Sequence, residues 1–448
     1  MLPVIAKSGP SSGATPNQKA GSTLPVLLAA FFVTGAMLFV AVPLLQRYSA
    51  HVYSMGFVDG YDLIADNLAH GNGYRWTANM SETMLREPGY PLFLATIFEL
   101  AGYHIEAVRF ANWLLTIAIA FMIMRLTRTV TADRNTALIA SLLFLFHPGT
   151  LVAEARGGVE IFFIFAALAF MLALHRAVEK GEPWRYLIAG LGFGFVLQVR
   201  STPLAFPALL LLFLCLTAKG ARERFRMALN VAILGLGMAV VMTPWVIRNY
   251  QLVHAFVPFT SLKGVALQEG QYTCLNRPFD GDFYVAGKGA GLERGELASQ
   301  LGLRFEGAQY FQIFYDARDE LTFSNILFQK AEAEYAKHPG LLAACVGRNL
   351  FNFWFLGKTW GVTELNMLIQ APLLMMALSG LYLLWKRSLL SRIGITLMFV
   401  LAIVAVHLPL VAEARYSIPV FAFLTIPVSV SVLAIWRKYG MLAQRGTI

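Results

Sequence analysis

The sequence predicts an all-α polytopic membrane protein with about ten transmembrane helices and two extracytoplasmic loop regions. Of its 448 residues, 57% are hydrophobic and only 14% are charged, too few charges to cover a soluble protein of this length. Several apolar runs approach or reach the length that crosses a bilayer as a helix, beginning with residues 24–45. The net charge of +10 is spread over short loops, which favours a lipid bilayer as partner over nucleic acid.

Basic residues are concentrated in short loops at 125–134, 175–185, 219–226 and 386–392, and in the terminal tails. Under the positive-inside rule these segments face the cytoplasm, so the spans between them come in pairs. The termini are then cytoplasmic, and the chain is a multi-pass protein of the cell (inner) membrane. The predicted spans are 24–45, 107–126, 136–150, 158–174, 186–199, 203–218, 227–246, 365–385, 393–409 and 416–436.

Two of the predicted spans are short for a bilayer. Residues 186–199 and 203–218 are joined at Val199-Arg200-Ser201-Thr202-Pro203, and a single long helix there would place the next basic loop outside. At 1.5 Å per residue each is shorter than the hydrocarbon core, so their junction is expected below the outer surface. Irregular backbone at that depth requires burial or a wet cavity, and we therefore expect a polar cavity open to the extracytoplasmic side.

The large outer loop is expected to contain two helices and two cysteines. In the large outer loop, residues 319–340 are typical of a helix that stops at His338-Pro339-Gly340, and residues 341–358 indicate an interfacial helix. Cys274 and Cys345 lie in this loop and could pair, although unpaired cysteines are the usual outcome.

The predicted domain organisation has five parts. They are a flexible cytoplasmic tail (1–23), an N-terminal transmembrane catalytic module (24–247) with the first outer loop (46–106), the large loop (248–364), the C-terminal helices (365–436) and a second cytoplasmic tail (437–448).

Acidic residues of the first outer loop are candidates for catalysis. On a helix, Asp59, Asp62 and Asp66 would share one face, which is also the pattern of a solvated acidic surface. Asp59 follows the first span and would lie at the mouth of the expected cavity. Glu160, which opens the fourth span, is the most interior outer acid, and either function or a structural pair with Arg156 explains it.

Several basic residues fall on the outer side, close to predicted helix ends. Snorkelling and pairing with Glu87, Glu154 or Glu413 would explain any one of them. As a group they indicate a bound anion, because a guanidinium donates two hydrogen bonds to a phosphate. A lipid phosphate is the obvious anion at that depth. The residues are Arg86, Arg109, Arg156, Arg200, Arg248, Arg348, Lys358 and Arg415.

No motif of a soluble enzyme is present. The sequence lacks GxSxG, a P-loop, HExxH and CxxC, and the histidines form no spaced ligand pair. The GLGFG run at 190–194 is apolar and typical of helix packing. We therefore predict no required metal and no other cofactor, although a divalent metal is an alternative that no motif indicates.

A series of short motifs runs in order along most of the chain. Asp59 is followed by a run ending in Gly71, Gly73 and Tyr74, and then by R.PGYPLFLA (86–95). The later motifs are Arg109-Phe110-Ala111-Asn112, His147-Pro148, Glu160, TPWVIRNY (243–250) and ARYSIP (414–419). With these motifs the chain resembles bacterial polytopic glycosyltransferases of the GT-C superfamily, relatives of the family 39 protein O-mannosyltransferases and the lipid A aminoarabinose transferases.

The resemblance implies transfer of a sugar from a polyprenyl-phosphate donor to a glycan, lipid or protein acceptor on the extracytoplasmic side, with Asp59 as general base. Many relatives have two adjacent acids where this chain has Asp59-Gly60, so Asp62 remains an alternative base. Glu160 is the third catalytic candidate. The candidate substrate-binding residues are Arg86, Tyr90, Arg200, Trp245, Arg248, Asn249, Lys358, Arg415 and Tyr416.

A polytopic transporter or flippase of a lipid-linked or anionic substrate is the alternative function. Transporters usually carry ionisable residues or broken helices at the bilayer midplane, often in two related halves. Here the centres of the predicted spans are essentially free of Asp, Glu, Lys and Arg, and no internal repeat is found. The polar residues gather toward one face, which favours an enzyme.

Overall fold

The computed structural model describes residues 23–44, 56–276, 283–307 and 312–445. The predicted tail at 1–22 lies outside these ranges, as do residues 446–448. In these ranges ten helices form a bundle: α1 (Thr23–Ala36, continued by the π-helix η1, Met37–Ala41), α5 (Ile105–Thr131), α6 (Arg134–Leu145), α8 (Glu160–Lys180), α9 (Pro183–Val199), α10 (Phe206–Thr217), α11 (Ala221–Val253), α16 (Trp360–Lys386), α17 (Leu390–His407) and α18 (Ile418–Arg445).

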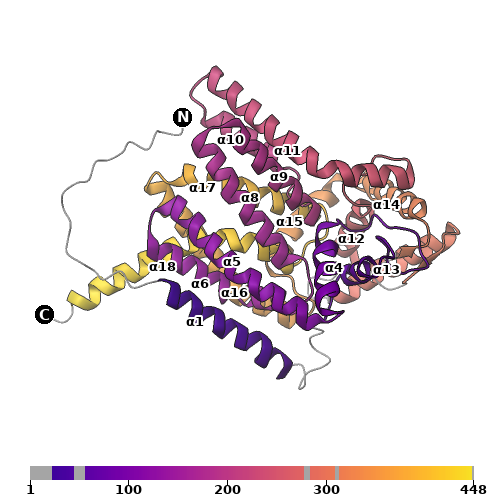
Figure 1. Ribbon diagram of the computed structural model, residues 1–448, viewed down its shortest axis with the longest axis horizontal. Helices are drawn as coiled ribbons and strands as arrows, with labels where there is room; N and C mark the ends of the chain where they lie inside the picture. The colour runs from indigo at the N-terminus through magenta and orange to yellow at the C-terminus, as the bar shows by residue number, and fades with distance from the viewer. Residues whose placement is uncertain (1–22, 45–55, 277–282, 308–311, 446–448) are drawn as a thin grey trace.

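The other elements gather at one end of this bundle. They are α3 (Tyr61–Ala69), α4 (Gly89–Ala101), α7 (Pro148–Ala155), α12 (Lys263–Asn276), α13 (Phe283–Gln300), α14 (Ala317–Lys337), α15 (Pro339–Phe355), the 3-10 helix η2 (Ala414–Ser417) and the antiparallel strands β1 (Phe305–Glu306) and β2 (Ile313–Phe314). We call the described residues within 56–104 and 254–337 the cap. Figure 1 shows its helices α4, α12, α13 and α14 together beside the bundle.

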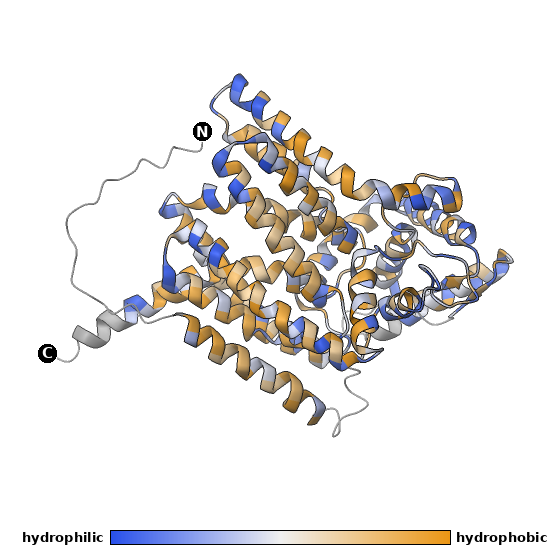
Figure 2. Ribbon diagram, in the orientation of Figure 1, coloured by the Kyte–Doolittle hydropathy of each residue, from blue (hydrophilic) through white to orange (hydrophobic). Residues whose placement is uncertain are grey.

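The predicted fold class is confirmed. Within the described ranges, seven helices are long and apolar enough to cross a membrane, and α6 with α7 makes an eighth if this pair, bent by 50°, is one span. All ten predicted runs coincide with helices, but α9 has 17 residues and α10 has 12, so neither has the length of an ordinary span. Figure 2 shows the apolar bundle with hydrophilic residues at its ends and in the cap.

Several helix boundaries differ from the predicted ones, and two of these differences have a clear physical reason. The span expected to end at residue 246 continues through Pro244 to Val253, because the cap supplies partners for its last turns. Trp245 Nε1 donates to the Phe259 carbonyl at 2.7 Å, and Asn249 Nδ2 donates to the Val257 carbonyl at 2.9 Å. The span expected over 136–150 breaks at residue 146, where His147 Nδ1 accepts from the Gly149 N–H at 3.1 Å and starts α7.

The centre of the bundle is formed by α8 and α18. The apolar window of α18 is 83% buried, whereas that of α16 is 22% buried and lies at the periphery. The glycines predicted to pack helices do so, because a Cβ on Gly190 would lie 2.1 Å from the Leu234 carbonyl oxygen of α11. Phenylalanines from α8, α9, α10 and α17 meet in the same core: Phe170, Phe193, Phe206 and Phe399.

The two outer loop regions predicted from the sequence fold into a single cap. Glu320 on α14 accepts hydrogen bonds from Thr83 Oγ1 at 2.6 Å and the Met84 N–H at 3.1 Å, and Ser261 Oγ also donates to it. Burial raises the pKa of Glu320, opposed by the hydrogen bonds from Ser261 and Thr83. This buried carboxyl group therefore joins residues from both loops, which the sequence presents as separate regions.

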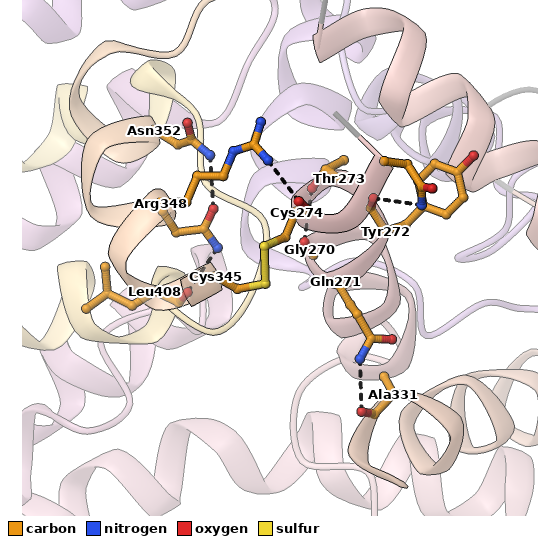
Figure 3. Close-up of a disulfide and its surroundings, with 12 residues drawn as sticks. Gly270, Gln271, Tyr272, Thr273, Cys274, Ala331, Cys345, Arg348, Asn352 and Leu408 are labelled. Atoms are coloured by element: carbon orange, nitrogen blue, oxygen red, sulfur yellow. Dashed lines mark hydrogen bonds between the residues drawn. A yellow bond between two sulfur atoms is a disulfide. The ribbon is translucent and has the colours of Figure 1, made fainter. Parts of the chain in front are cut away.

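Cys274 and Cys345 form a disulfide that links α12 to α15, so the expectation of unpaired cysteines is wrong (Figure 3). Arg348 on α15 donates from Nη1 to the Cys274 carbonyl at 2.8 Å. One turn of α15 also supports the chain after α17, since Asn349 Nδ2 donates to the carbonyls of Leu408 at 2.9 Å and Leu410 at 2.6 Å. The disulfide thus fixes α12 and α15 beside the segment that leads into η2.

The two helices expected in the large loop are present. The first is α14, which ends at Lys337 with His338 as its C-cap, as the His-Pro-Gly stop signal predicts. The second is α15, which begins at Pro339 and ends at Phe355. Its interfacial position remains a prediction.

Candidate active site

Asp59 lies in a strained turn rather than on a helix. Its φ is 63°, Gly60 follows with φ 71°, and α3 begins only at Tyr61. Aspartate tolerates this left-handed region better than most residues, and Gly60 is required because a Cβ there would lie 2.0 Å from the Trp76 ring. The expectation that Asp59 shares a helical face with Asp62 and Asp66 is therefore wrong.

The carboxylate of Asp59 is paired with Arg415. Arg415 Nη1 lies 2.9 Å from Asp59 Oδ2, and Nη2 lies 3.3 Å from Oδ1, a two-point contact between guanidinium and carboxylate. Burial raises the pKa of Asp59, but Arg415 and Arg86 outweigh it and hold the pKa at about 2. Asp59 is consequently ionised at any physiological pH.

The R.PGYP motif builds the frame around this turn. Arg86 donates from Nε and Nη2 to the Asp59 carbonyl at 3.0 and 2.8 Å, and its guanidinium stacks on Tyr61. Glu87 accepts from the N–H and the hydroxyl of Ser201, at 3.1 and 2.6 Å. A Cβ on Gly89 would lie 2.8 Å from the Gln198 carbonyl oxygen, so this glycine lets α4 approach the end of α9. The motif therefore positions Asp59 relative to the residues that follow α9.

Arg200 and Arg415 flank the same aromatic ring. The guanidinium carbons of Arg200 and Arg415 lie 4.7 and 5.0 Å from the centroid of Tyr416, and Arg415 Nη2 also lies 3.2 Å from the Tyr416 hydroxyl. Arg200 is partly exposed, and within the described ranges its guanidinium forms no hydrogen bond or ion pair. Asp59 compensates the charge of Arg415, whereas no carboxylate of the described residues forms an ion pair with Arg200. An oxyanion bound here would contact Arg200 and lie close to Arg415.

Further charges complete the site. Arg415 Nε also contacts Glu413, one of the acids expected to pair with an outer arginine. Glu160, at the start of α8, is buried and interacts electrostatically with Arg415 and Arg156. Burial lowers the pKa of Arg156, with Arg415 acting in the same direction and Glu160, Glu413 and Asp59 opposing them. Arg156, Glu413 and, in the cap, Glu269 belong to this charge cluster although the predicted site did not include them.

Glu269 on α12 brings the cap into contact with the site. Burial raises the pKa of Glu269, opposed by Arg294 and reinforced by Glu413. Arg294 Nη2 lies 3.5 Å from the Glu269 carboxylate. A Cβ on the next residue, Gly270, would lie 2.5 Å from the Leu410 backbone, so α12 packs directly on the chain before η2. A spacing pattern could not have identified Glu269, because only this packing brings it to the cluster.

The carboxylate of Asp62 contacts a tyrosine. Its Oδ2 accepts from the Tyr103 hydroxyl at 2.5 Å, and the side chain is buried on α3. Burial raises the pKa of Asp62, and the hydrogen bond from Tyr103 opposes this effect. The geometry therefore favours Asp59 over Asp62 as the carboxylate beside an anion site.

Arg248 occupies a different position from the one expected for a phosphate ligand. It donates from Nη1 to the Thr83 carbonyl at 2.7 Å and from Nη2 to Glu82 at 3.0 Å. Its guanidinium also lies over the rings of Tyr74 and Trp245. Together with Asn249, whose side chain is fully buried, Arg248 and Trp245 attach the end of α11 to the cap. The structure does not bring these three residues to Asp59.

The remaining predicted site residues lie at the edges of the cluster. Tyr90 is fully buried and its ring packs edge-on against Tyr61. It therefore supports the residue that follows the Asp59-Gly60 turn. Lys358 is exposed and follows Leu356, whose carbonyl accepts from the Ala414 N–H at 2.9 Å. The backbone of the 356–358 segment is therefore adjacent to η2. In the described part of the chain, no group of three His, Cys, Asp or Glu side chains could hold a metal ion.

An apolar cavity of about 380 Å³ lies between α6, α16 and α18. Its lining includes Leu143, Phe146, His147, Leu373 and Phe421, with His147 stacked on Phe421 at a centroid distance of 4.1 Å. Phe421 follows Arg415 by six residues, which is roughly 9 Å along a helix. The cavity is distinct from the charge cluster, because Phe421 lies in α18 whereas Arg415 lies in η2, which precedes it.

Comparisons with known proteins concern the fold of the chain. The model of the dolichyl-phosphate-mannose-protein mannosyltransferase family matches residues 86–247. The archaeal oligosaccharyltransferase AglB from Archaeoglobus fulgidus, solved with an inhibitory peptide and a dolichol-phosphate, superposes with a TM-score of 0.52 at 15% identity, over 95% of this chain and 52% of that one.

The chain has a GT-C fold. A crystal structure of the Archaeoglobus fulgidus oligosaccharyltransferase, tethered to an acceptor peptide containing the NVT sequon, matches similarly with a TM-score of 0.54 at 13% identity, over 94% of this chain and 50% of that one. This GT-C chain spans about half the length of those structures. No curated protein matches it. The predicted resemblance to the GT-C superfamily is confirmed. The segment that matches the mannosyltransferase family model includes Arg86, Glu160 and Arg200.

Proposed function

We propose that the protein is a membrane glycosyltransferase that moves a sugar from a polyprenyl-phosphate-linked donor to an acceptor on the extracytoplasmic face. One observation carries the proposal: an ionised carboxylate, Asp59, lies in contact with Arg415 and near Arg200, at one end of an apolar bundle. The match to a family whose description names a dolichyl-phosphate-mannose donor supports it.

The chemistry follows from the charges of the site. The acceptor oxygen attacks C1 of the sugar as the bond between C1 and the phosphate oxygen breaks, and the bonding electrons leave with the polyprenyl phosphate. Asp59 accepts the acceptor's proton as a general base. The phosphate is a good leaving group and needs no proton, so Arg200 and Arg415 act by stabilising its charge. Attack opposite the leaving phosphate inverts the anomeric centre.

Two observations support the extracytoplasmic side. The disulfide between Cys274 and Cys345 belongs to the same end of the bundle as Asp59, and disulfides persist in oxidising compartments. The basic loops lie at the other end, since α8 and α18 start near Asp59 and end near their basic segments. The apolar cavity beside Phe421 has the chemistry to take part of an isoprenoid chain whose phosphate lies at Arg415.

A transport function has less support. The ionisable residues of the site gather at one end of the spans, whereas transporters usually hold theirs at the midplane.

The test is transfer by the purified protein in lipid nanodiscs. Candidate polyprenyl-phosphate sugars are supplied with acceptors identified by comparing surface glycans and glycolipids of cells with and without the chain by mass spectrometry. We expect release of polyprenyl phosphate together with glycosylated acceptor in wild type, and loss of both in Asp59→Asn. Donor translocation across the bilayer without any sugar transfer would overturn the proposal in favour of transport.

A further inference from the structure

We infer that Arg415 is shared between Asp59 and the donor, so that the donor's phosphate releases the general base. In the donor-free protein the guanidinium of Arg415 is paired with the carboxylate of Asp59. When the donor binds, the guanidinium leaves this carboxylate and pairs with the phosphate. The acceptor can then be deprotonated only when a donor is in place. This inference rests on the proposed function and concerns the order of events at the same site.

The first support is that the carboxylate is fully engaged. Both oxygens of Asp59 face the guanidinium of Arg415, at 2.9 and 3.3 Å. A carboxylate held at both oxygens by a cation is a weak base, because the cation stabilises the form that has lost its proton. An acceptor hydroxyl would have to compete with Arg415 for the same oxygens. The observed geometry is therefore not the reactive one.

The second support is that one partner is fixed and the other can move. The Asp59 turn is held by two hydrogen bonds from Arg86 to its carbonyl and by the contact of Gly60 with Trp76. Arg415 is a long side chain with 26% of its surface exposed. It has other partners within reach, the Tyr416 hydroxyl at 3.2 Å and the Glu413 carboxylate. Movement during the exchange is thus expected in Arg415.

The third support is the position of Arg200. It lies over the Tyr416 ring, as Arg415 does, and within the described residues its guanidinium has no anionic contact. A phosphate bound by Arg200 would lie beside Tyr416 and close to Arg415. Guanidinium binds phosphate in the same two-point manner as carboxylate, so the donor can replace Asp59 as partner.

The inference predicts competition between Asp59 and phosphate for one guanidinium. The experiment measures binding of a polyprenyl phosphate without sugar to the full-length protein in nanodiscs. We expect Asp59→Asn to bind it about tenfold more tightly than wild type, if Arg415 is engaged by Asp59 for at least nine-tenths of the time in the donor-free protein. Equal or weaker binding by a folded Asp59→Asn would overturn the inference.

Two further variants separate exchange from general electrostatics. Glu160→Gln removes a neighbouring carboxylate that is not in the two-point contact, and we expect a clearly smaller gain in affinity. In an Arg415→Ala background, Asp59→Asn should give no gain, since the shared guanidinium is absent. A tenfold gain in affinity for polyprenyl phosphate from Glu160→Gln would show that the loss of any nearby negative charge is enough. A gain from Asp59→Asn that persists without Arg415 would show the same. Either result would overturn the proposed exchange.

A measurement on wild type covers the case in which Asp59→Asn does not fold. In a cryo-EM structure with bound polyprenyl phosphate, we expect the guanidinium of Arg415 to contact the phosphate and to have left the carboxylate of Asp59. An unchanged pair with phosphate bound would overturn the inference while leaving the proposed function intact. Failure of wild type to bind any polyprenyl phosphate would overturn both.

Discussion

Asp59 and Arg415 are 356 positions apart in the chain, yet the guanidinium of Arg415 contacts both carboxylate oxygens of Asp59. Asp59 precedes α3 in the cap, and Arg415 lies in η2 at the start of the last helix of the bundle. This contact therefore joins the cap to the bundle at the point where we place the chemistry. The predictions below test the roles of the residues around it.

Asp59→Asn should abolish sugar transfer. Loss of a general base lowers the rate by about 10² to 10⁴-fold, and the amide cannot accept the acceptor's proton. Transfer by the purified variant is compared with wild type after its folding has been verified by thermal melting. Asp62→Asn is the matched control, because Asp62 contacts Tyr103 and not the arginines, and it should retain transfer. The opposite result, with Asp62→Asn inactive and Asp59→Asn active, would assign the base to Asp62.

Arg200→Ala and Arg248→Ala should differ in what they lose. Arg200→Ala is expected to weaken donor binding about tenfold or more with little change in stability, because among the described residues its guanidinium stacks on Tyr416 but forms no hydrogen bond or ion pair. Arg248→Ala is expected to lower stability by about 1–3 kcal/mol, since it leaves Glu82 and the Thr83 carbonyl without their donor. Thermal melting and donor-binding measurements on both variants show which of them loses stability and which loses donor affinity. Weaker donor binding by a stable Arg248→Ala protein would restore the phosphate-ligand hypothesis for Arg248.

Removing the disulfide should destabilise the cap. A bridge that closes a loop of 71 residues contributes about 4 kcal/mol in the chain-entropy model. We expect the double variant Cys274→Ser, Cys345→Ser to melt at lower temperature and to bind donor less tightly, because α12 and α15 support the chain before Arg415. Cys215→Ser is the control, since Cys215 is not bridged. A double variant that melts like wild type would show that the bridge is dispensable.

The pH dependence should differ between the donor-free and donor-bound protein. Asp59 acts as a base only when ionised, so activity falls as the pH drops through its pKa, which is about 2 in the donor-free protein. When Arg415 leaves for the phosphate, the pKa of Asp59 rises above this value, because burial raises it and only the smaller effects of Arg86 and Arg200 still oppose burial. The acid limb of kcat/KM for the acceptor, measured at saturating donor, should therefore lie at a higher pH than about 2. An acid limb that stays at about pH 2 would contradict the exchange.

The charged groups around Asp59 set the size of this shift. A pH–rate profile measured on Arg86→Gln separates the effect of Arg86 from that of Arg415. In the proposed exchange only Arg415 moves, whereas Arg86 stays hydrogen-bonded to the Asp59 carbonyl with and without donor. The other groups that act on Asp59 or on Arg415 are Arg200, Arg156, Glu160, Glu269 and Glu413.

The membrane orientation can be tested at the end of α11. Gln251 is exposed in the last turns of this helix. In a Cys215→Ser background, Gln251→Cys should react with a membrane-impermeant thiol reagent in intact cells, because the cap is expected outside. Labelling that requires broken cells would place Asp59 and the cap in the cytoplasm and would contradict the proposed function.

Local patterns predicted the helices well and the roles of individual arginines poorly. Arg200 and Arg248 both follow apolar runs, so their local sequences are alike. Only the packing of the cap shows that Arg248 meets Glu82, whereas Arg200 lies over Tyr416. The same holds for the cysteines, since a separation of 71 residues says nothing about their distance in space.

The sequence by itself determined that this is an all-α polytopic membrane protein, and it singled out Asp59, Arg86 and Arg415. Those conclusions depend on the length and polarity of continuous segments and on short motifs, which are local properties of a chain. The tertiary structure alone decided that Arg86 and Arg415 meet Asp59 while Asp62 and Arg248 do not. Such contacts depend on how distant segments pack, and a single sequence carries no direct record of those distances.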